Sequence, residues 1–285
     1  MPTAQLGERT ALLIEGAEAE HFLQNILTVD LDRLESGEAR PGALLSPQGK
    51  ILFDFLISCH GENGFLLDCR SEQADDFMRR LMMYRLRSKV DIAVAKQILV
   101  FASWDNDSAP SQTDSGWLID RRFASGVERY YGEAMETNAS PEEFARLRIA
   151  HGIAESGADF APSDAFPHDV LLDQNGGVGF QKGCYIGQEV VSRMQHRGTA
   201  RRRVMIVSAN TDLPEAGTAV LVDARTIGTL GGVSGPNGLA ILRIDRVKAA
   251  LDAGEEITAG GVALTASIPP WANYTLPQTA ETGET

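Results

Sequence analysis

The first hundred residues combine short apolar runs of strand length with two amphipathic helical patterns. The turn Ser46-Pro47-Gln48-Gly49 separates two of the runs and predicts a hairpin. Predicted strands are 10–14, 43–45, 51–58, 65–68, 90–94 and 98–103, and predicted helices are 17–27 and 71–86, the second with Ser71 as its N-cap. This order favours an α+β layer over a βαβ alternation.

The middle of the chain is mostly loop by pattern. The polar stretch 105–115 predicts an exposed loop and a first boundary. Ser140, Pro141, Glu142 and Glu143 predict the start of a helix that ends near residue 152. From there to about residue 179 few segments are periodic, and a loop of that length usually covers or binds something.

After residue 201 the pattern changes to short β-rich runs with closely spaced glycines, at 204–208, 219–222, 226–233, 239–244 and 262–266. This spacing predicts a small antiparallel barrel or sandwich as a separate unit, followed by a frayed tail at 275–285. The expected parts are therefore an N-terminal lobe at 1–104, a second lobe at 105–200 and the β unit at 201–285.

Charge narrows the set of partners. The formal net charge is −13 and the pI is about 4.8, so the average surface repels nucleic-acid phosphates and anionic lipids. Any anion site must then be a local exception. No apolar run reaches membrane length, and residues 1–10 lack the pattern of a signal peptide. We expect a cytoplasmic protein without a membrane partner.

Cysteine and histidine spacing predicts neither a disulfide framework nor a metal site. The three cysteines form no C-x-x-C pair, and the five histidines are scattered. Cys59 and His60 are the nearest approach to a ligand pair, but a structural zinc normally needs about four ligands.

Residues 176–193 carry the strongest chemical signal. Five glycines, at 176, 177, 179, 183 and 187, let the backbone approach a ligand, and residues 188–193 can start a helix whose first amides point outward. Lys182 adds a mobile positive charge, which makes Cys184 a candidate reactive thiol. The alternatives are a small buried cysteine and an ordinary tight turn. Neither a G-x-G-x-x-G nor a Walker A pattern is present.

The run Lys182-Gly183-Cys184-Tyr185-Ile186-Gly187-Gln188-Glu189 resembles the K-G-C-Y-x-G-Q-E signature of the YgfZ family, relatives of the glycine cleavage T-protein, an aminomethyltransferase. Segments 42–57, 146–152, 166–169 and 197–198 extend the resemblance over nearly the whole chain. It implies a T-protein-like three-unit ring of α+β class, with two intertwined mixed α/β lobes and a C-terminal antiparallel β-barrel. It also implies binding of tetrahydrofolate or a one-carbon derivative, and support of iron–sulfur cluster assembly or repair, including enzymes of tRNA thiolation.

The resemblance also implies a set of site residues. Cys184 and Asp54 are the expected catalytic residues, and the expected folate-binding residues are Lys182, Gly183, Tyr185, Gln188, Glu189, Asp169, Arg193 and Arg197. Asp169 occupies the position of an acid that can accept the amino-pyrimidine edge of a pterin, with a solvated loop aspartate as the alternative. The basic strip, which consists of Arg193, His196, Arg197, Arg201, Arg202 and Arg203, suits the anionic glutamate tail, or else keeps a strand edge from pairing.

Two departures from the T-proteins bear on activity. Their strand carries two adjacent acids where this chain has Phe53 and Asp54, and residues 150–154 lack the acid and proline common among relatives. We therefore expect an accessory protein rather than a classical enzyme, with folate-dependent aminomethyl transfer as the alternative.

A third reading, direct tRNA binding through the basic strip, is opposed by the net charge. One cysteine cannot hold a cluster, which needs about four ligands, so any cluster contact is transient or shared with an iron–sulfur client or assembly partner.

Overall fold

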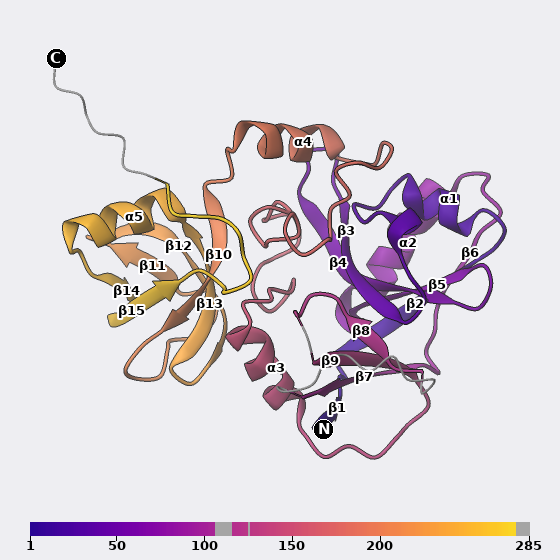
Figure 1. The fold of residues 1–285 in the computed structure, drawn as a ribbon, viewed down its shortest axis with the longest axis horizontal. Coiled ribbons are helices and arrows are strands. Elements are labelled where there is room, and N and C mark those ends of the chain that lie inside the picture. Colours follow the sequence, from indigo (N-terminus) through magenta and orange to yellow (C-terminus); the bar gives the residue numbers. More distant parts are fainter. Residues whose placement is uncertain (106–115, 125, 278–285) are drawn as a thin grey trace. The chain divides into compact units, whose positions relative to one another are not determined.

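The computed structural model describes residues 1–105, 116–124 and 126–277, which fall into two units (Figure 1). The sheet unit comprises 1–144, 162–167 and 172–193, and the barrel unit comprises 145–161, 168–171 and 194–285. Each unit is therefore built from separate stretches of chain. The predicted loop at 105–115 and the predicted tail at 275–285 lie largely outside the described residues.

A nine-stranded sheet organises the sheet unit, in the order β1-β7-β9-β8-β3-β4-β5-β2-β6. Neighbouring strands are antiparallel except for β3 and β8, which run parallel. The strands are β1 (Thr3–Gln5), β2 (Arg9–Glu15), β3 (Glu38–Leu45), β4 (Ile51–His60), β5 (Gly64–Arg70), β6 (Asp91–Val94), β7 (Leu99–Trp104), β8 (Leu118–Asp120) and β9 (Val127–Gly132). The predicted hairpin is β3–β4, where the Gly49 amide donates to the Ser46 carbonyl at 2.8 Å.

Two helices, α1 (Ala19–Gln24) and α2 (Ala74–Arg85), contribute to the apolar core of the sheet unit. The ring of Phe77 on α2 stacks on Phe53 at 4.7 Å and on Phe55 at 5.5 Å, measured between ring centroids. Because side chains alternate along a strand, Asp54 lies on the other face of β4. Residues 71–73 form a 3-10 turn and Gln73 is the N-cap of α2, so the predicted cap at Ser71 is wrong.

An ion-pair network is buried between β2, β5, β8 and β9. The Asp68 carboxylate accepts a hydrogen bond from Arg9 Nε at 2.5 Å and from the Tyr131 hydroxyl at 3.1 Å. Arg129, which is fully buried, places Nε 3.1 Å from an Asp120 oxygen. Burial alone would raise the pKa of Asp120, but Arg122 and Arg129 outweigh it and hold that pKa below its usual value. Removing one partner would leave a buried charge uncompensated.

The barrel unit contains a closed barrel in the order β10-β13-β12-β11-β14-β15. Its strands are β10 (Arg202–Ser208), β11 (Ala219–Val222), β12 (Arg225–Ser234), β13 (Asn237–Arg243), β14 (Ile257–Ala259) and β15 (Val262–Ser267). Helix α5 (Ile244–Ala253) buries Val247 and Ala250 in the barrel core. The predicted antiparallel barrel is thus confirmed, while α5 was not predicted.

Helix α3 (Pro141–Ala150) begins as the sequence predicts. The Glu143 amide donates to Ser140 Oγ at 3.3 Å, and the Ser140 amide donates to a Glu143 carboxylate oxygen at 2.8 Å. This is a reciprocal capping box. Its C-terminal part belongs to the barrel unit, where Arg148 NH1 donates to the Ile153 carbonyl at 2.5 Å and pairs with Asp159 at 2.5 Å. Asp159 in turn accepts the Gly232 amide at 2.8 Å, which fastens residues 145–161 to β12.

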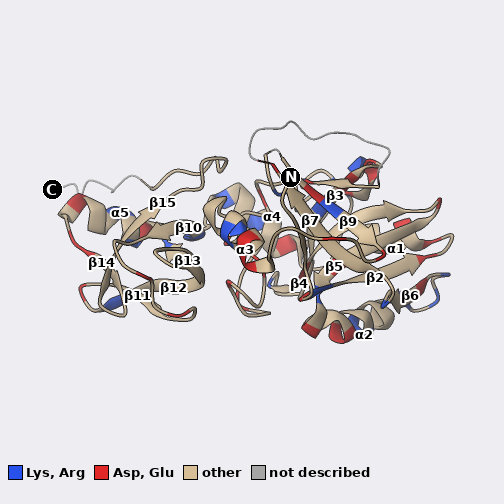
Figure 2. Cartoon of the chain, turned by 90° about the horizontal axis from the view of Figure 1, so that it is seen from below, with Lys and Arg blue, Asp and Glu red and all other residues tan. Residues whose placement is uncertain are grey.

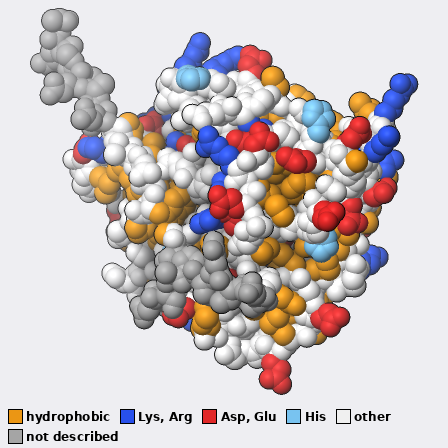
Figure 3. All heavy atoms as spheres, turned by 45° about the vertical axis from the view of Figure 1, so that its right-hand side comes forward, with side chains coloured by type: hydrophobic (Ala, Val, Ile, Leu, Met, Phe, Trp, Pro, Cys, Tyr) orange, Lys and Arg blue, Asp and Glu red, His pale blue; other side chains and the backbone are white. Residues whose placement is uncertain are grey.

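Charged residues of both signs lie on many of the helices and strands. Figure 2 shows acidic and basic residues on the same elements, including α2, and the face drawn in Figure 3 shows exposed apolar side chains among the charged ones. The most exposed large apolar side chains of the described residues are Met1, Met82, Met83, Leu86, Phe180 and Leu251. No helix in the described part of the chain is long and apolar enough to cross a membrane.

Candidate functional site

The signature loop, residues 176–187, is fastened to the segment that follows α1. Thr28 makes the link: its hydroxyl donates to the Gly177 carbonyl at 2.6 Å and accepts the Ala43 amide at 2.9 Å, while its carbonyl accepts the Gly179 amide at 2.8 Å. Ala43 is the register partner of Asp54 across β3 and β4. One buried threonine therefore ties the loop to the strand pair that carries Asp54.

Lys182 contacts the same segment, on both sides of Thr28. Its Nζ donates to the Leu27 carbonyl at 2.9 Å and to the Val29 carbonyl at 2.7 Å, and lies 5.4 Å from the centroid of the Tyr185 ring. Burial lowers the pKa of Lys182 to about 8, against the opposing effect of Asp30 and Asp32. The expected mobile cation is instead a fixed anchor of the loop.

Tyr185 is the buried member of the signature. Its side chain is 7% exposed, and burial raises the pKa of its hydroxyl to about 12, so it stays neutral at physiological pH. Together, Lys182 and Tyr185 hold the stretch that presents Cys184.

Gly187 and Gly49 allow a close approach between the signature loop and the β3–β4 turn. Gly187 has φ +79°, and a Cβ there would lie 2.6 Å from the Ser46 carbonyl oxygen. A Cβ on Gly49 would lie 2.9 Å from Val190 Cβ. This contact fixes the start of helix α4 (Gln188–Arg197), whose first residues are the predicted site residues Gln188 and Glu189.

Cys184 is exposed, so its thiol is accessible to another molecule. Its neighbour Gly183 has open space where a Cβ would be, with nothing within 4 Å. A small buried cysteine, the alternative reading, is wrong for this position. Among the described residues, no group of three or more His, Cys, Asp or Glu side chains could hold a metal ion.

The charged residues at the start of α4 contact one another. Glu189 and Arg193 form an i,i+4 ion pair at 2.5 Å, and both side chains are exposed. Gln188 Nε2 donates weakly to the Gly183 carbonyl at 3.4 Å. An exposed pair of this kind contributes little to stability and leaves both groups available to a ligand.

The barrel unit holds the other predicted acid. Asp169 is 2% exposed, its carboxylate lies 4.0 Å from Arg202 Nε, and its carbonyl accepts the Val204 amide at 2.7 Å. The alternative of a solvated loop aspartate is therefore wrong.

The basic strip does not form one surface. Arg203 is 8% exposed, its NH1 donates to the His168 carbonyl at 2.7 Å, and its guanidinium lies 5.4 Å from the centroid of the Tyr274 ring. Arg201 is exposed. Strand alternation turns Arg202 and Arg203 to opposite sides. The strip is therefore divided between a buried anchor and exposed cations.

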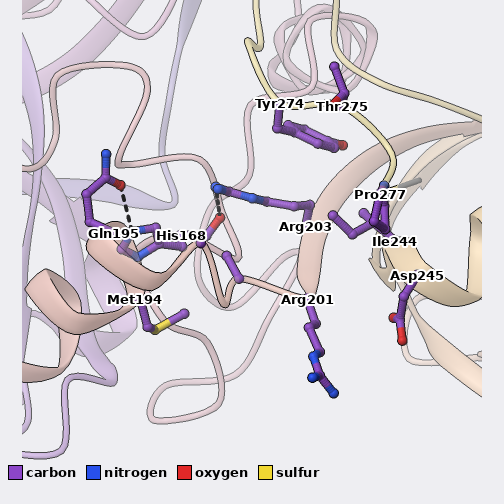
Figure 4. Close-up of a pocket in the computed structure, with 12 residues that line it drawn as sticks. His168, Met194, Gln195, Arg201, Arg203, Ile244, Asp245, Tyr274, Thr275 and Pro277 are labelled. Carbon is purple, nitrogen blue, oxygen red and sulfur yellow. Dashed lines mark hydrogen bonds between the residues drawn. The ribbon is translucent and has the colours of Figure 1, made fainter. Parts of the chain in front are cut away.

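A cavity of about 360 Å³ opens beside this anchor in the barrel unit (Figure 4). Figure 4 shows Arg203 extending toward His168 beneath Tyr274, while Arg201 points in another direction. His168 Nε2 lies 3.1 Å from Gln195 Oε1. The lining residues are His168, Met194, Gln195, Gly198, Ala200, Arg201, Arg203, Ile244, Asp245, Tyr274, Thr275 and Pro277. Its size suits a small organic ligand.

The predicted site residues divide between the units. The sheet unit holds Asp54, Lys182, Gly183, Cys184, Tyr185, Gln188, Glu189 and Arg193, and the barrel unit holds Asp169 and Arg197. Sequence reasoning missed Thr28 and Tyr274. Their contacts are with residues far away in sequence, so no local pattern marks them.

Two family models match the chain. The GCVT N-terminal domain matches residues 7–101, and the CAF17 C-terminal beta-barrel domain matches residues 201–274. The crystal structure of glycine cleavage system aminomethyltransferase T from Bartonella henselae superimposes with a TM-score of 0.71 at 17% identity, covering 95% of this chain and 86% of that one. The chain has a GcvT-like fold. The predicted α+β class with a C-terminal antiparallel barrel is confirmed.

Other relatives are more similar to this chain in sequence than that structure is. The mitochondrial iron–sulfur cluster assembly factor IBA57 of Homo sapiens is 29% identical, over 94% of this chain and 84% of its own length. Its homologue from Chaetomium globosum is also 29% identical, over 79% of this chain and 60% of its own length. The GcvT-like chain thus resembles proteins named for iron–sulfur assembly.

Proposed function

We propose that this chain is an accessory protein of iron–sulfur cluster assembly or repair that acts through the exposed thiol of Cys184. The observation that carries the proposal is the position of this thiol, on a loop fixed by Lys182, Thr28 and Gly187 yet open to other molecules. The relatives named as assembly factors support the same role.

The ligand count supports a shared cluster. Clusters are held by about four ligands, and the described residues contain no group of three that could hold a metal. Cys184 therefore supplies one thiolate to a cluster whose other ligands belong to a partner protein. A fixed loop suits this task, because little conformational entropy is lost when the partner binds.

Tetrahydrofolate, or a one-carbon derivative, is the small molecule that we propose for this chain. The residue types match its two ends: a carboxylate such as that of Asp169 is the kind of group that accepts the donors of an amino-pyrimidine edge, and exposed cations such as Arg201 and Arg197 suit the glutamate tail. Lys182 would act indirectly, by holding the loop. Enzymes of tRNA thiolation as clients and a cytoplasmic location stay predictions from the sequence.

Complementation tests the thiol role. A strain lacking this protein, supplied with Cys184→Ala, should retain about as little iron–sulfur enzyme activity as the empty strain. Cys59→Ala is the matched control, because Cys59 is also an exposed free cysteine, and it should restore activity fully. Full restoration by Cys184→Ala at equal protein level would sink the proposal. Thiolated tRNA from the same cells tests the client class.

Calorimetric titration with tetrahydrofolate tests the ligand. Asp169→Asn should weaken binding by about 10-fold or more, because a neutral amide replaces a buried charge-assisted acceptor. Glu215→Gln, on a loop of the barrel unit with an exposed side chain, serves as the control. Absence of binding heat for the unaltered protein would remove folate from the proposal and leave the thiol role standing.

The alternative is folate-dependent aminomethyl transfer of the T-protein type. The half-buried Asp54, on the strand where the T-proteins carry their acid pair, favours it. Incubation with tetrahydrofolate and an aminomethyl donor would then yield methylene-tetrahydrofolate, and Asp54→Asn would abolish the yield. A yield equal to that of the buffer blank removes this alternative.

A further inference from the structure

The last turn of α2 and the residues after it expose three apolar side chains. Met82, Met83 and Leu86 are 46%, 66% and 86% exposed. At 3.6 residues per turn they project on the side opposite Phe77 and Leu81, which are fully buried. The outward side of this helix end is therefore apolar, where a surface helix normally carries polar residues.

Five cations lie close in sequence to these side chains. Residues 79–89 contain Arg79, Arg80, Arg85, Arg87 and Lys89 and no acid, in a chain whose net charge is −13. Arg79 pairs with Asp76, and Arg85 NH1 donates to the Val90 carbonyl at 3.1 Å. The side chains of Arg80, Arg87 and Lys89 make no ion pair or hydrogen bond with any residue that the structure describes.

Backbone contacts hold this exposed segment in place. Leu86 has φ +47° and ψ −105°, a conformation that is strained for a bulky residue. The Lys89 amide donates to a Glu18 carboxylate oxygen at 2.6 Å, and the Ser88 amide donates to the Arg85 carbonyl at 2.8 Å. A Cβ on Gly16 would lie 2.3 Å from the Lys89 carbonyl oxygen, so the two segments are in direct contact. The exposure of Leu86 is built into the fold.

We propose that residues 79–89 dock on the surface of an anionic lipid bilayer. The apolar side chains enter the boundary between headgroups and acyl chains, and the flanking arginines and lysine stay at the level of the lipid phosphates. The apolar patch of three side chains is small beside a stable protein interface, which buries about 800 Å² on each partner. A bilayer offers phosphate and hydrocarbon together and needs no matching shape.

The net charge does not forbid this contact. At about 0.1 M salt the Debye length is about 10 Å, so carboxylates farther away are screened. Acids do lie near this segment: Asp75 and Asp76 in the first turn of α2, Glu18 beside Leu86, and Asp91 two residues after Lys89. The net charge opposes adhesion of the average surface to anionic lipids, and the proposed contact is a local exception to that average. It also requires no segment that spans the membrane. It is independent of the proposed function.

Vesicle sedimentation tests the proposal. The full chain should sediment with vesicles of equal parts phosphatidylcholine and phosphatidylglycerol at low salt. It should not sediment with phosphatidylcholine alone, and raising the salt should release it. Leu86→Asp combined with Met83→Asp should weaken sedimentation at least about 10-fold, and so should Arg87→Glu combined with Lys89→Glu.

Matched controls lie on the barrel unit. Leu251→Asp replaces an apolar side chain that is 55% exposed, and Arg225→Glu reverses an exposed cation, and both should bind vesicles like the unaltered protein. Urea midpoints would show that every variant is folded. The proposal is overturned by absence of sedimentation at low salt, by controls that lose as much as the patch variants, or by salt-independent binding. Binding of soluble polyglutamate without vesicle binding would overturn it in favour of an acidic protein partner.

Discussion

The signature loop and the basic strip each assign opposite roles to two residues that are close in sequence. In the loop, Lys182 faces inward onto two carbonyls, while Cys184 two residues later is exposed. In the strip, Arg203 faces inward onto the His168 carbonyl, while Arg201 is exposed. In both regions one cation fixes the backbone so that a nearby group stays open. A cation that is close in sequence to an exposed residue therefore need not face the same ligand as that residue.

The largest expected difference is in the rate of alkylation of two thiols, those of Cys184 and Cys69. Burial raises the pKa of Cys69 to about 12, which reduces its thiolate population about 1000-fold relative to an ordinary thiol, and its side chain is 1% exposed. Iodoacetamide followed by peptide mass spectrometry should therefore label Cys184 long before Cys69. Equal labelling of the two in the folded protein would contradict the assignment of Cys184 to the open side of the loop.

Glycine replacement separates the fixed part of the loop from its open part. Gly187→Ala should lower the free energy of unfolding by about 3 kcal/mol or more, because its Cβ would meet the Ser46 carbonyl and its φ is positive. Gly183→Ala, with nothing within 4 Å, should change it by less than about 1 kcal/mol. Urea denaturation measures both. Similar losses would show that the loop is uniformly packed.

Lys182→Met should cost about 1–3 kcal/mol, because the Leu27 and Val29 carbonyls lose their partner. The pH dependence gives a second signature. With the pKa of Lys182 lowered to about 8, the folded chain binds fewer protons than the unfolded chain between pH 8 and the ordinary value of 10.5. Unfolding free energy should therefore rise with pH in this window, and Lys182→Met should lack that rise. If the unfolding free energies of the unaltered protein and of Lys182→Met ran parallel with pH, the assigned burial of the Lys182 amine would be refuted.

The last comparison is between two arginines of the basic strip. Arg203→Met should lower the unfolding free energy by about 2 kcal/mol, since the variant loses the bond to the His168 carbonyl and the contact with Tyr274. Arg201→Met should change it by less than about 0.5 kcal/mol. Thermal unfolding of the two variants decides the comparison, and the reverse order would mean that Arg201 is the anchor.

Local pattern predicted much of the fold. The β3–β4 hairpin, the capping box of α3 and the barrel follow from turn residues, N-cap chemistry and strand spacing, which act over a few residues. Strands β1, β8, β9 and β14 and helix α5 were missed. For α5 a signal existed, since Ile244, Val247 and Ala250 are apolar at helical spacing.

The sequence by itself determined the class of fold, the signature loop and the identity of Cys184 as its distinctive side chain, because these depend on residue types at short spacing. Only the tertiary structure decided which charged side chains are buried and which are exposed to solvent. Lys182 became half-buried through its contacts with the backbone of residues 27–29. Asp169 and Arg203 became buried, Asp169 beside Arg202 of β10 and Arg203 against the His168 carbonyl. Burial depends on what packs against a residue from distant parts of the chain, and that information is absent from its neighbours in sequence.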